Sequence, residues 1–218
     1  MRATVYTTVL CLSLIMGGCS IPSNCQTNKI ETMKNVKFIP KEFNDIKLGF
    51  RESIQNVCSP QFSGLIPVNS ITINSPQKII CKNNKNVYVP IIPVCVVYDV
   101  SLRRGLKYYH LNVELLHIRR IGDEKIYTGE IFEKGLENEY PDYPSGYYEE
   151  LERIEADVKE AQKYSDDDLD SGQSSGGYMN IDLLEYVDVP LQSGLYEIYL
   201  SFSGLESNHV QVEIVFEE

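Results

Sequence analysis

Two stretches near the end of the chain decide its fold: Gly194-Leu195-Tyr196-Glu197-Ile198-Tyr199-Leu200-Ser201-Phe202-Ser203 and Asn208-His209-Val210-Gln211-Val212-Glu213-Ile214-Val215-Phe216. In each stretch, every second side chain is large and apolar. This period of two predicts a β-strand with one buried face and one solvent-exposed face. The polar residues between them, 203–208, predict the loop of a hairpin.

The same signature recurs upstream. Stretches rich in Val, Ile, Tyr and Thr are separated by Pro, Gly and Asn, which is typical of a chain built from strands. Residues 121–124, Ile-Gly-Asp-Glu, predict the turn of a second hairpin. The other predicted strands are residues 35–39, 65–74, 77–82, 86–100, 106–120, 124–132 and 182–189.

Residues 190–200 resemble the penultimate strand of an immunoglobulin-like sandwich. Such strands often carry a Gly-x-Tyr corner, here Gly194 to Tyr196, whose tyrosine hydroxyl bonds back to the backbone. The resemblance implies a mainly β fold, an immunoglobulin-like antiparallel β-sandwich. The chain contains no Trp, so it is not a standard antibody-type domain. A fold resemblance says nothing about chemistry.

An acidic segment separates the two groups of predicted strands. Residues 137–170 hold 13 Asp and Glu against 3 Lys and Arg, a net charge of −10. Apolar side chains at helical spacing predict an amphipathic helix over 147–163, packed on the sandwich with its acidic face outward. Pairs four residues apart, such as Glu155–Lys159, favour this helix. The Asp-, Ser- and Gly-rich residues 165–177 predict a flexible loop.

The length sets the domain organisation. About 200 residues are enough for one good core or two small ones. The simplest arrangement is one sandwich domain over residues 35–218 with a helical and acidic insertion at 137–177. The alternative is two small β domains, 35–134 and 180–218, joined by that insertion.

The N-terminus reads as an export signal. Residues 1–18 combine a short basic start with an apolar run too short to span a membrane. Residues 14–19, Leu-Ile-Met-Gly-Gly-Cys, resemble a bacterial lipobox. The resemblance implies a lipidated Cys19 that begins an anchored segment, 19–34. Ser20 in second place resembles lipoproteins sorted to the outer membrane, so we expect a periplasm-facing protein. The alternative is an ordinary secretory signal.

Four cysteines remain after the signal and the lipidated residue. In an oxidising compartment they predict two disulfides, and three pairings are open. A zinc site is the rival interpretation, but no pair has the C-x₂-C spacing and no His lies nearby. The disulfide candidates are Cys25, Cys58, Cys81 and Cys95.

The charge balance restricts the partner class. The full chain carries 31 Asp and Glu against 20 Lys and Arg, a net charge of −11, which becomes −12 when Arg2 leaves with the signal. This argues against nucleic acid, which is bound through Lys and Arg, and against docking on anionic lipid. The acidic charge favours a basic protein partner, or it contributes to solubility alone.

Two sequence motifs suggest a hydrolase site and a calcium site, but the residues around each motif do not fit these functions. Residues 172–176 match G-x-S-x-G, with Asp182 and His209 downstream. A hydrolase elbow needs a buried strand before it and a helix after it, and neither is predicted. Residues 166–177 begin like an EF-hand loop, but its Gly and final Glu positions hold Ser171 and Gly177. We therefore predict no catalytic residue, no metal site and no cofactor.

A candidate contact surface lies around the acidic segment. Tyrosines are good interface anchors, and acidic side chains would attract a basic partner. The alternative is that the tyrosines only pack the helix. Two basic groups frame one predicted hairpin: Arg103 and Arg104 with Lys107, and Arg119 and Arg120 with Lys125. This basic end would meet the acidic helix of its own chain or lipid phosphates, or form a solvated strand end. The predicted partner-binding residues are Tyr140, Tyr143, Tyr147, Tyr148, Glu149, Glu152, Glu155, Asp157, Asp166, Asp167 and Asp168.

The overall layout resembles the periplasmic immunity lipoproteins of contact-dependent (type VI) secretion systems. That resemblance implies a protein that binds and neutralises a secreted toxic enzyme, for example a lipase or phospholipase, by occluding its active site. The partner would be a cognate toxin, and the membrane would be reached through the lipid anchor. The alternatives are an envelope assembly or adhesion module without inhibitory role, and a hydrolase.

Overall fold

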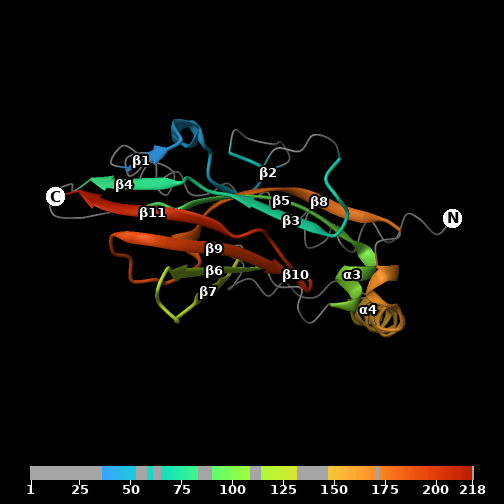
Figure 1. Ribbon diagram of the computed structural model, residues 1–218. Helices are drawn as coiled ribbons and strands as arrows, with labels where there is room; N and C mark the ends of the chain where they lie inside the picture. Colours follow the sequence, from blue (N-terminus) through green and yellow to red (C-terminus); the bar gives the residue numbers. More distant parts are fainter. Residues whose placement is uncertain are drawn as a thin grey trace.

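The computed structural model describes residues 36–52, 58–60, 65–82, 90–108, 114–131, 147–169 and 172–217. Within these ranges the chain is mainly β: two sheets pack face to face, with few helices (Figure 1). Both sheets contain strands from before and after the acidic helix. The fold class expected from the alternating sequence pattern is confirmed.

The larger sheet contains the C-terminal hairpin. Its strands lie in the order β1-β4-β11-β9-β6-β7, and the short β10 also pairs with β9. All pairs are antiparallel except β4 and β11, which run parallel. The bounds are β1 Val36–Ile39, β4 Lys78–Lys82, β6 Leu115–Arg120, β7 Tyr127–Glu130, β9 Gly194–Phe202, β10 Leu205–Glu206 and β11 Val210–Glu217.

The smaller sheet has the order β2-β8-β5-β3, and all its pairs are antiparallel. Its strands are β2 Gly49–Glu52, β3 Ser70–Asn74, β5 Pro93–Ser101 and β8 Ser174–Asp182. The chain runs from β3 in this sheet directly to β4 in the other, which is how a sandwich turns a corner. The helical elements are η1 Lys41–Asp45, α3 Leu102–Lys107, α4 Tyr147–Ala161, η3 Asp166–Asp168 and η4 Leu183–Glu185.

The core lies between the sheets and follows the alternation of the sequence. Ile198, Leu200 and Val212 of the larger sheet are at most 2% exposed. An edge-to-face contact of Tyr98 with Phe202, with ring centroids 6.3 Å apart, joins the two sheets. Each fully buried side chain of this size contributes about 1.5–3 kcal/mol relative to an exposed one.

The tyrosine corner is present as predicted. The hydroxyl of Tyr196 donates to the carbonyl oxygen of Gln192 and accepts from the amide nitrogen of the same residue, both at 3.0 Å. Tyr196 is 1% exposed. The corner therefore ties the start of β9 to the loop that precedes it, as in immunoglobulin-like sandwiches.

The prediction for residues 165–189 was wrong in two places. Residues 174–177 form the start of β8 rather than a flexible loop, because Ser101 to Tyr98 of β5 pair with them along their length. A Cβ on Gly176 would lie 2.6 Å from the carbonyl oxygen of Tyr98, so this close strand pairing requires the glycine. The predicted strand 182–189 is instead the end of β8, the η4 turn and an irregular segment.

The predicted strand 106–120 was also wrong in its first part. Residues 102–107 form α3, because Ser101 caps it: the side chain of Ser101 accepts a hydrogen bond from the amide of Arg104 at 3.2 Å. Residues 115–120 form the strand β6, and residues 109–113 lie outside the described ranges. The chain therefore turns away from the sheet after β5 and presents a short basic helix.

The predicted amphipathic helix is α4. It packs chiefly against α3 at one end of the sandwich, on the right in Figure 1, rather than on a sheet face. Ala161 is 3% exposed, whereas Ile154 and Val158 are half-buried. The helix thus projects from the sandwich edge and exposes much of its polar surface.

Candidate functional site

The acidic helix α4 carries the residues that sequence reasoning assigned to a partner. Glu152 and Glu155 are exposed. Asp157 is half-buried, because it lies about 140° around the helix from Glu152 and faces the body of the protein. The helix begins with Tyr147, Tyr148 and Glu149, but the structure does not describe their side chains. The side chain of Asp167 is likewise not described. Two further predicted residues, Tyr140 and Tyr143, lie outside the described ranges.

The negative charge of this region is only partly compensated by the helix itself. Residues 147–169 hold nine Asp and Glu against three Lys and Arg, a net charge of −6. The predicted ion pair between Glu155 and Lys159 does not form, and Lys163 pairs with Glu160 instead. Within the described part of the chain, neither Glu152 nor Glu155 makes an ion pair.

A clasp between the α3 region, residues 103–108, and the segment just after α4, residues 164–168, ties the end of this helix to the sandwich. The ammonium of Lys107 binds a carboxylate oxygen of Asp166 at 2.5 Å and the carbonyl oxygen of Tyr164 at 2.9 Å. The hydroxyl of Tyr108 donates to the same carboxylate, at 3.0 and 3.1 Å. The hydrogen bond from Lys107, followed by that from Tyr108, lowers the pKa of Asp166.

A second cation completes the clasp. The guanidinium of Arg103 lies over the ring of Tyr164, 4.7 Å from its centroid, and donates to the carbonyl oxygen of Asp168 at 3.3 Å. Leu169, which follows, is fully buried, and its carbonyl oxygen accepts from the side chain of Ser101. Of the two basic groups in the predicted hairpin, the one with Arg103 and Lys107 contacts the chain's own acidic segment. In the other group, Arg119 pairs with Glu197 of the larger sheet instead.

The clasp divides the predicted contact surface. Asp166 and the backbone of Asp168 are engaged within the chain, so they position α4. Glu152 and Glu155 remain exposed on the helix and are available to a partner. The candidate site is therefore an acidic ridge on a helix whose end is tied to the sandwich, and we define this ridge as Glu152 and Glu155 of α4.

A polar aromatic ladder crosses the outer face of the larger sheet, and sequence reasoning missed it. The ring of Tyr199 stacks on His117 on one side and on His209 on the other, each at a centroid distance of 4.4 Å. His117 bonds to the hydroxyls of Thr128 and Ser201, at 3.0 and 2.8 Å. The period of two places these residues on one face, but their adjacency depends on the strand register.

The two histidines of the ladder titrate differently. Burial lowers the pKa of His117. A hydrogen bond to Glu206, at 3.1 Å, raises the pKa of His209, and a contact with Glu197 at 3.4 Å adds to this. Burial acts to raise the pKa of Glu197, but the bonds from Arg119, at 2.6 Å, and His209 outweigh it and lower that pKa. The protonated form of His209 is thus held between two carboxylates.

The contact between His117 and Ser201 has the distance of a nucleophile–base pair, but its setting favours a structural role. His117 lies on β6, which pairs with β9 on one side and β7 on the other. The backbone amides that an oxyanion hole would need are used in the hydrogen bonds between these paired strands. The contact fits the hydrogen bonds that hydroxyl and imidazole groups form between neighbouring strands.

The G-x-S-x-G residues do not assemble into a triad. Ser174 begins β8 and Asp182 ends it, about 26 Å apart at the rise of a strand. Asp182 accepts hydrogen bonds from the amides of Ile92 and Leu184, as a local cap. His209 lies on the other sheet, in the ladder. This motif therefore has no catalytic geometry.

One disulfide joins Cys58 to Cys95, with Cα atoms 5.9 Å apart. Tyr98 faces the core, so the alternation of β5 places Cys95 on the opposite, outer face of the smaller sheet, where Asn74 also donates to the carbonyl oxygen of Cys58 at 2.8 Å. A link across 37 residues stabilises the fold by about 4 kcal/mol in the chain-entropy treatment. Cys81 is a buried free thiol, and Cys25 lies outside the described residues.

Among the residues that the structure describes, no three His, Cys, Asp or Glu side chains cluster closely enough to hold a metal ion. None of the helices in those ranges is long and apolar enough to span a bilayer. The predicted signal, residues 1–18, and the predicted lipidation site, Cys19, lie outside the described residues.

Comparison of the chain with protein-family models, with curated proteins and with solved structures finds no match in any of the three.

Proposed function

We propose that this protein is a periplasm-facing lipoprotein that binds and neutralises a secreted toxic enzyme. The observation that carries the proposal is the acidic ridge on α4. A helix whose end is tied by Lys107, Arg103 and Tyr108 loses less conformational freedom on binding than an untied one, which favours affinity. Glu152 and Glu155 are exposed and make no ion pair within the described residues, so their charges would speed the encounter with a basic partner.

The inhibitory mechanism that we propose is occlusion. The ridge would dock over the mouth of the toxin's active site, and the anchor at Cys19 would hold the inhibitor where the toxin acts. The tyrosines next to the ridge, Tyr147 and Tyr148, would supply the buried anchors that carry most of the affinity in protein interfaces.

A capture experiment identifies the partner. Tagged protein lacking the signal, made in an oxidising compartment, is used to capture proteins from native lysate, with mass spectrometry as readout. We expect one stoichiometric secreted enzyme whose activity is lost in the complex. Recovery of envelope components alone would refute inhibition and favour an assembly or adhesion module.

Charge reversal tests the binding surface. Glu152→Lys with Glu155→Lys is expected to reduce the association rate with the toxin about tenfold at low salt, with little change in stability. The matched control is Glu124→Lys with Glu130→Lys, which makes the same charge change at exposed positions around β7. Equal effects of the two double variants would show that only net charge matters, not the ridge.

The membrane anchor is tested separately. Cys19→Ser is expected to move the protein from the detergent fraction to the soluble fraction, because no acyl chains can then be attached. Retention of this variant in the detergent fraction would refute the lipoprotein proposal while leaving the inhibitor proposal intact.

A further inference from the structure

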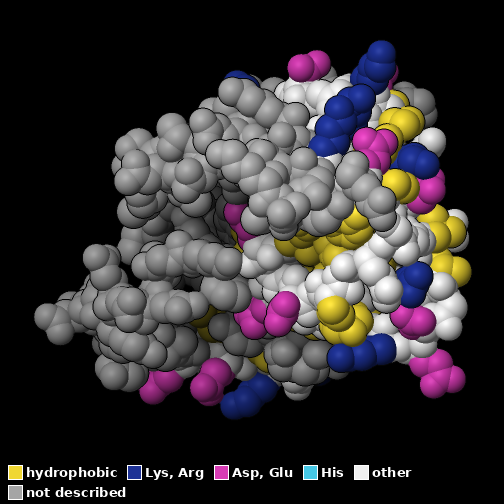
Figure 2. All heavy atoms as spheres, turned by 90° about the vertical axis from the view of Figure 1, so that its left-hand side faces the viewer, with side chains coloured by type: hydrophobic (Ala, Val, Ile, Leu, Met, Phe, Trp, Pro, Cys, Tyr) yellow, Lys and Arg dark blue, Asp and Glu magenta, His cyan; other side chains and the backbone are white. Residues whose placement is uncertain are grey.

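An apolar groove opens at the end of the sandwich away from α4. Figure 2 shows this end, where hydrophobic side chains gather near the centre among charged ones. The groove has a volume of about 700 Å³, within the range of sites that hold ligands or peptide side chains. Its lining includes Pro90, Leu184, Asp188, Val189, Leu191 and Phe216.

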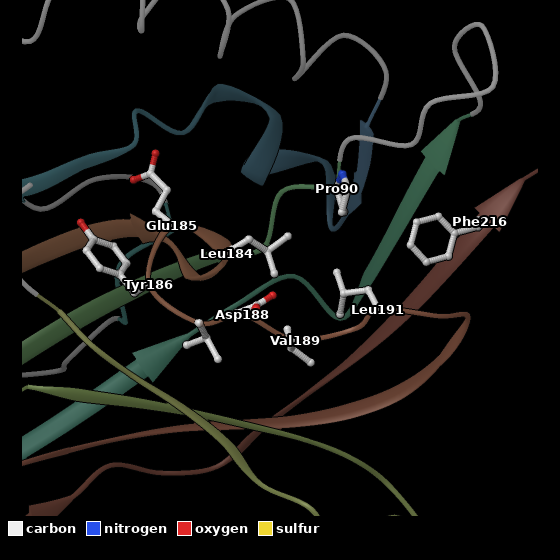
Figure 3. A pocket seen from close by; sticks show the side chains of 9 residues that line it. Pro90, Leu184, Glu185, Tyr186, Asp188, Val189, Leu191 and Phe216 are labelled. Carbon is white, nitrogen blue, oxygen red and sulfur yellow. The ribbon is translucent and has the colours of Figure 1, made fainter.

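Three separate parts of the chain build the groove. Pro90 precedes β5, Phe216 lies near the end of β11, and the remaining residues follow β8. Figure 3 shows Pro90, Leu184, Leu191 and Phe216 arranged around a common space. Leu184, Leu191 and Phe216 are only partly buried against the core, so they form an apolar floor that stays in contact with solvent.

The charge of the lining has one sign. Glu185 and Asp188 line the groove, and no Lys or Arg among the described residues does so. Asp188 is exposed at its rim. An apolar floor beside carboxylates favours a ligand that combines apolar groups with a positive charge.

Part of the backbone beside the groove has no partner in the described structure. Residues 187–192 belong to neither sheet, although the amide of Val187 and the backbone of Gln192 are hydrogen-bonded. Among the described residues, Asp188, Val189 and Leu191 make no backbone hydrogen bond. Val189 precedes Pro190, which disfavours helical backbone and holds it extended. Pro190 has no N–H, but residues 188, 189 and 191 each offer an N–H and a C=O group. An extended segment with such groups beside side-chain pockets is the arrangement that binds peptides by adding a strand.

We propose that this groove binds an extended segment of a partner protein, with apolar side chains at alternate positions and Lys or Arg between them. The segment bonds to the backbone of 188–191, places an apolar side chain on the floor and sets its cations against Asp188. This contact lies at the other end of the sandwich from α4, so it does not depend on the function of the acidic ridge.

Matched peptides test the proposal on the purified, oxidised protein. The probe is fluorescein-labelled Gly-Lys-Val-Lys-Leu-Lys-Val-Gly, and the comparison peptide has Glu in place of each Lys. In physiological salt, fluorescence anisotropy is expected to show saturable binding of the Lys peptide, at least about tenfold tighter than the Glu peptide. Methylation of alternate backbone nitrogens of the probe is expected to abolish binding, because it removes the donors for strand addition.

Two variants locate the binding. Asp188→Asn is expected to weaken the Lys peptide about fivefold. Glu160→Gln removes the same charge from an exposed position on α4 and is expected to leave binding unchanged. The proposal is overturned by absence of saturable binding, by equal weakening in both variants, or by undiminished binding of the methylated probe.

Discussion

Replacing Tyr196 by phenylalanine removes one oxygen atom from the corner that fixes β9. The hydroxyl makes two hydrogen bonds to the backbone of Gln192, both at 3.0 Å. Each contributes about 1 kcal/mol net, and Gln192 is exposed enough for its peptide groups to regain water. We therefore expect the free energy of unfolding to fall by about 2 kcal/mol, which lowers Tm by roughly 4–8 °C for a domain of this size.

Equilibrium unfolding in urea measures this change, with an unchanged m-value as evidence that the unfolded state is the same. Tyr199→Phe is the matched control, because the hydroxyl of Tyr199 makes no hydrogen bond that involves the described residues. It is expected to change stability by less than about 0.5 kcal/mol. Equal effects of the two substitutions would refute the assignment of a stabilising tyrosine corner.

Three further predictions concern single sites. Gly129→Ala is expected to destabilise the fold by more than about 2 kcal/mol in urea unfolding, because its Cβ would lie 2.1 Å from the carbonyl oxygen of Tyr186; a neutral result would contradict this packing. His209 stabilises the fold below its unfolded pKa of about 6.5, and this contribution is lost as pH rises through its raised folded value. The stability difference between the native protein and His209→Gln should therefore shrink from pH 5.5 to 8.5, and a constant difference would exclude its ionic bond to Glu206. Burial raises the pKa of Cys81 from 9.0 to about 11, so its alkylation at pH 8, mapped by mass spectrometry, should be at least about 100-fold slower than in urea; rapid native labelling would show that the site opens.

Strands with large alternating side chains were predictable from sequence, and strands made of small residues were not. Residues 194–202 and 210–217 alternate clearly, and the structure has both as strands. Residues 174–177, Ser-Ser-Gly-Gly, carry no such pattern, and they are strand because β5 pairs with them. In residues 182–189 the apolar side chains indicated a strand, but Asp182 caps a turn there and several of the side chains line the groove.

In the candidate site, too, features that depend on local sequence were predictable, and features that depend on contacts between distant residues were not. Helix α4 was predictable because its periodicity is local. The clasp was foreseen only as one of three roles for the basic groups, since nothing local shows that Lys107 reaches Asp166. The stack of His117, Tyr199 and His209 requires the register of three strands, and the pairing of Cys58 with Cys95 requires the crossing of a loop over the smaller sheet.

The position of β11 has a consequence for the order in which the molecule assembles. This strand, residues 210–217, lies between β4 and β9 and follows every other described strand in the chain. A chain that emerges N-terminus first from a ribosome or a membrane pore cannot join β1 and β4 to β9, β6 and β7 until these residues arrive. Until then, both fragments keep an open edge that invites pairing with other chains. Loss of residues 210–217 would therefore divide the larger sheet in two rather than shorten it.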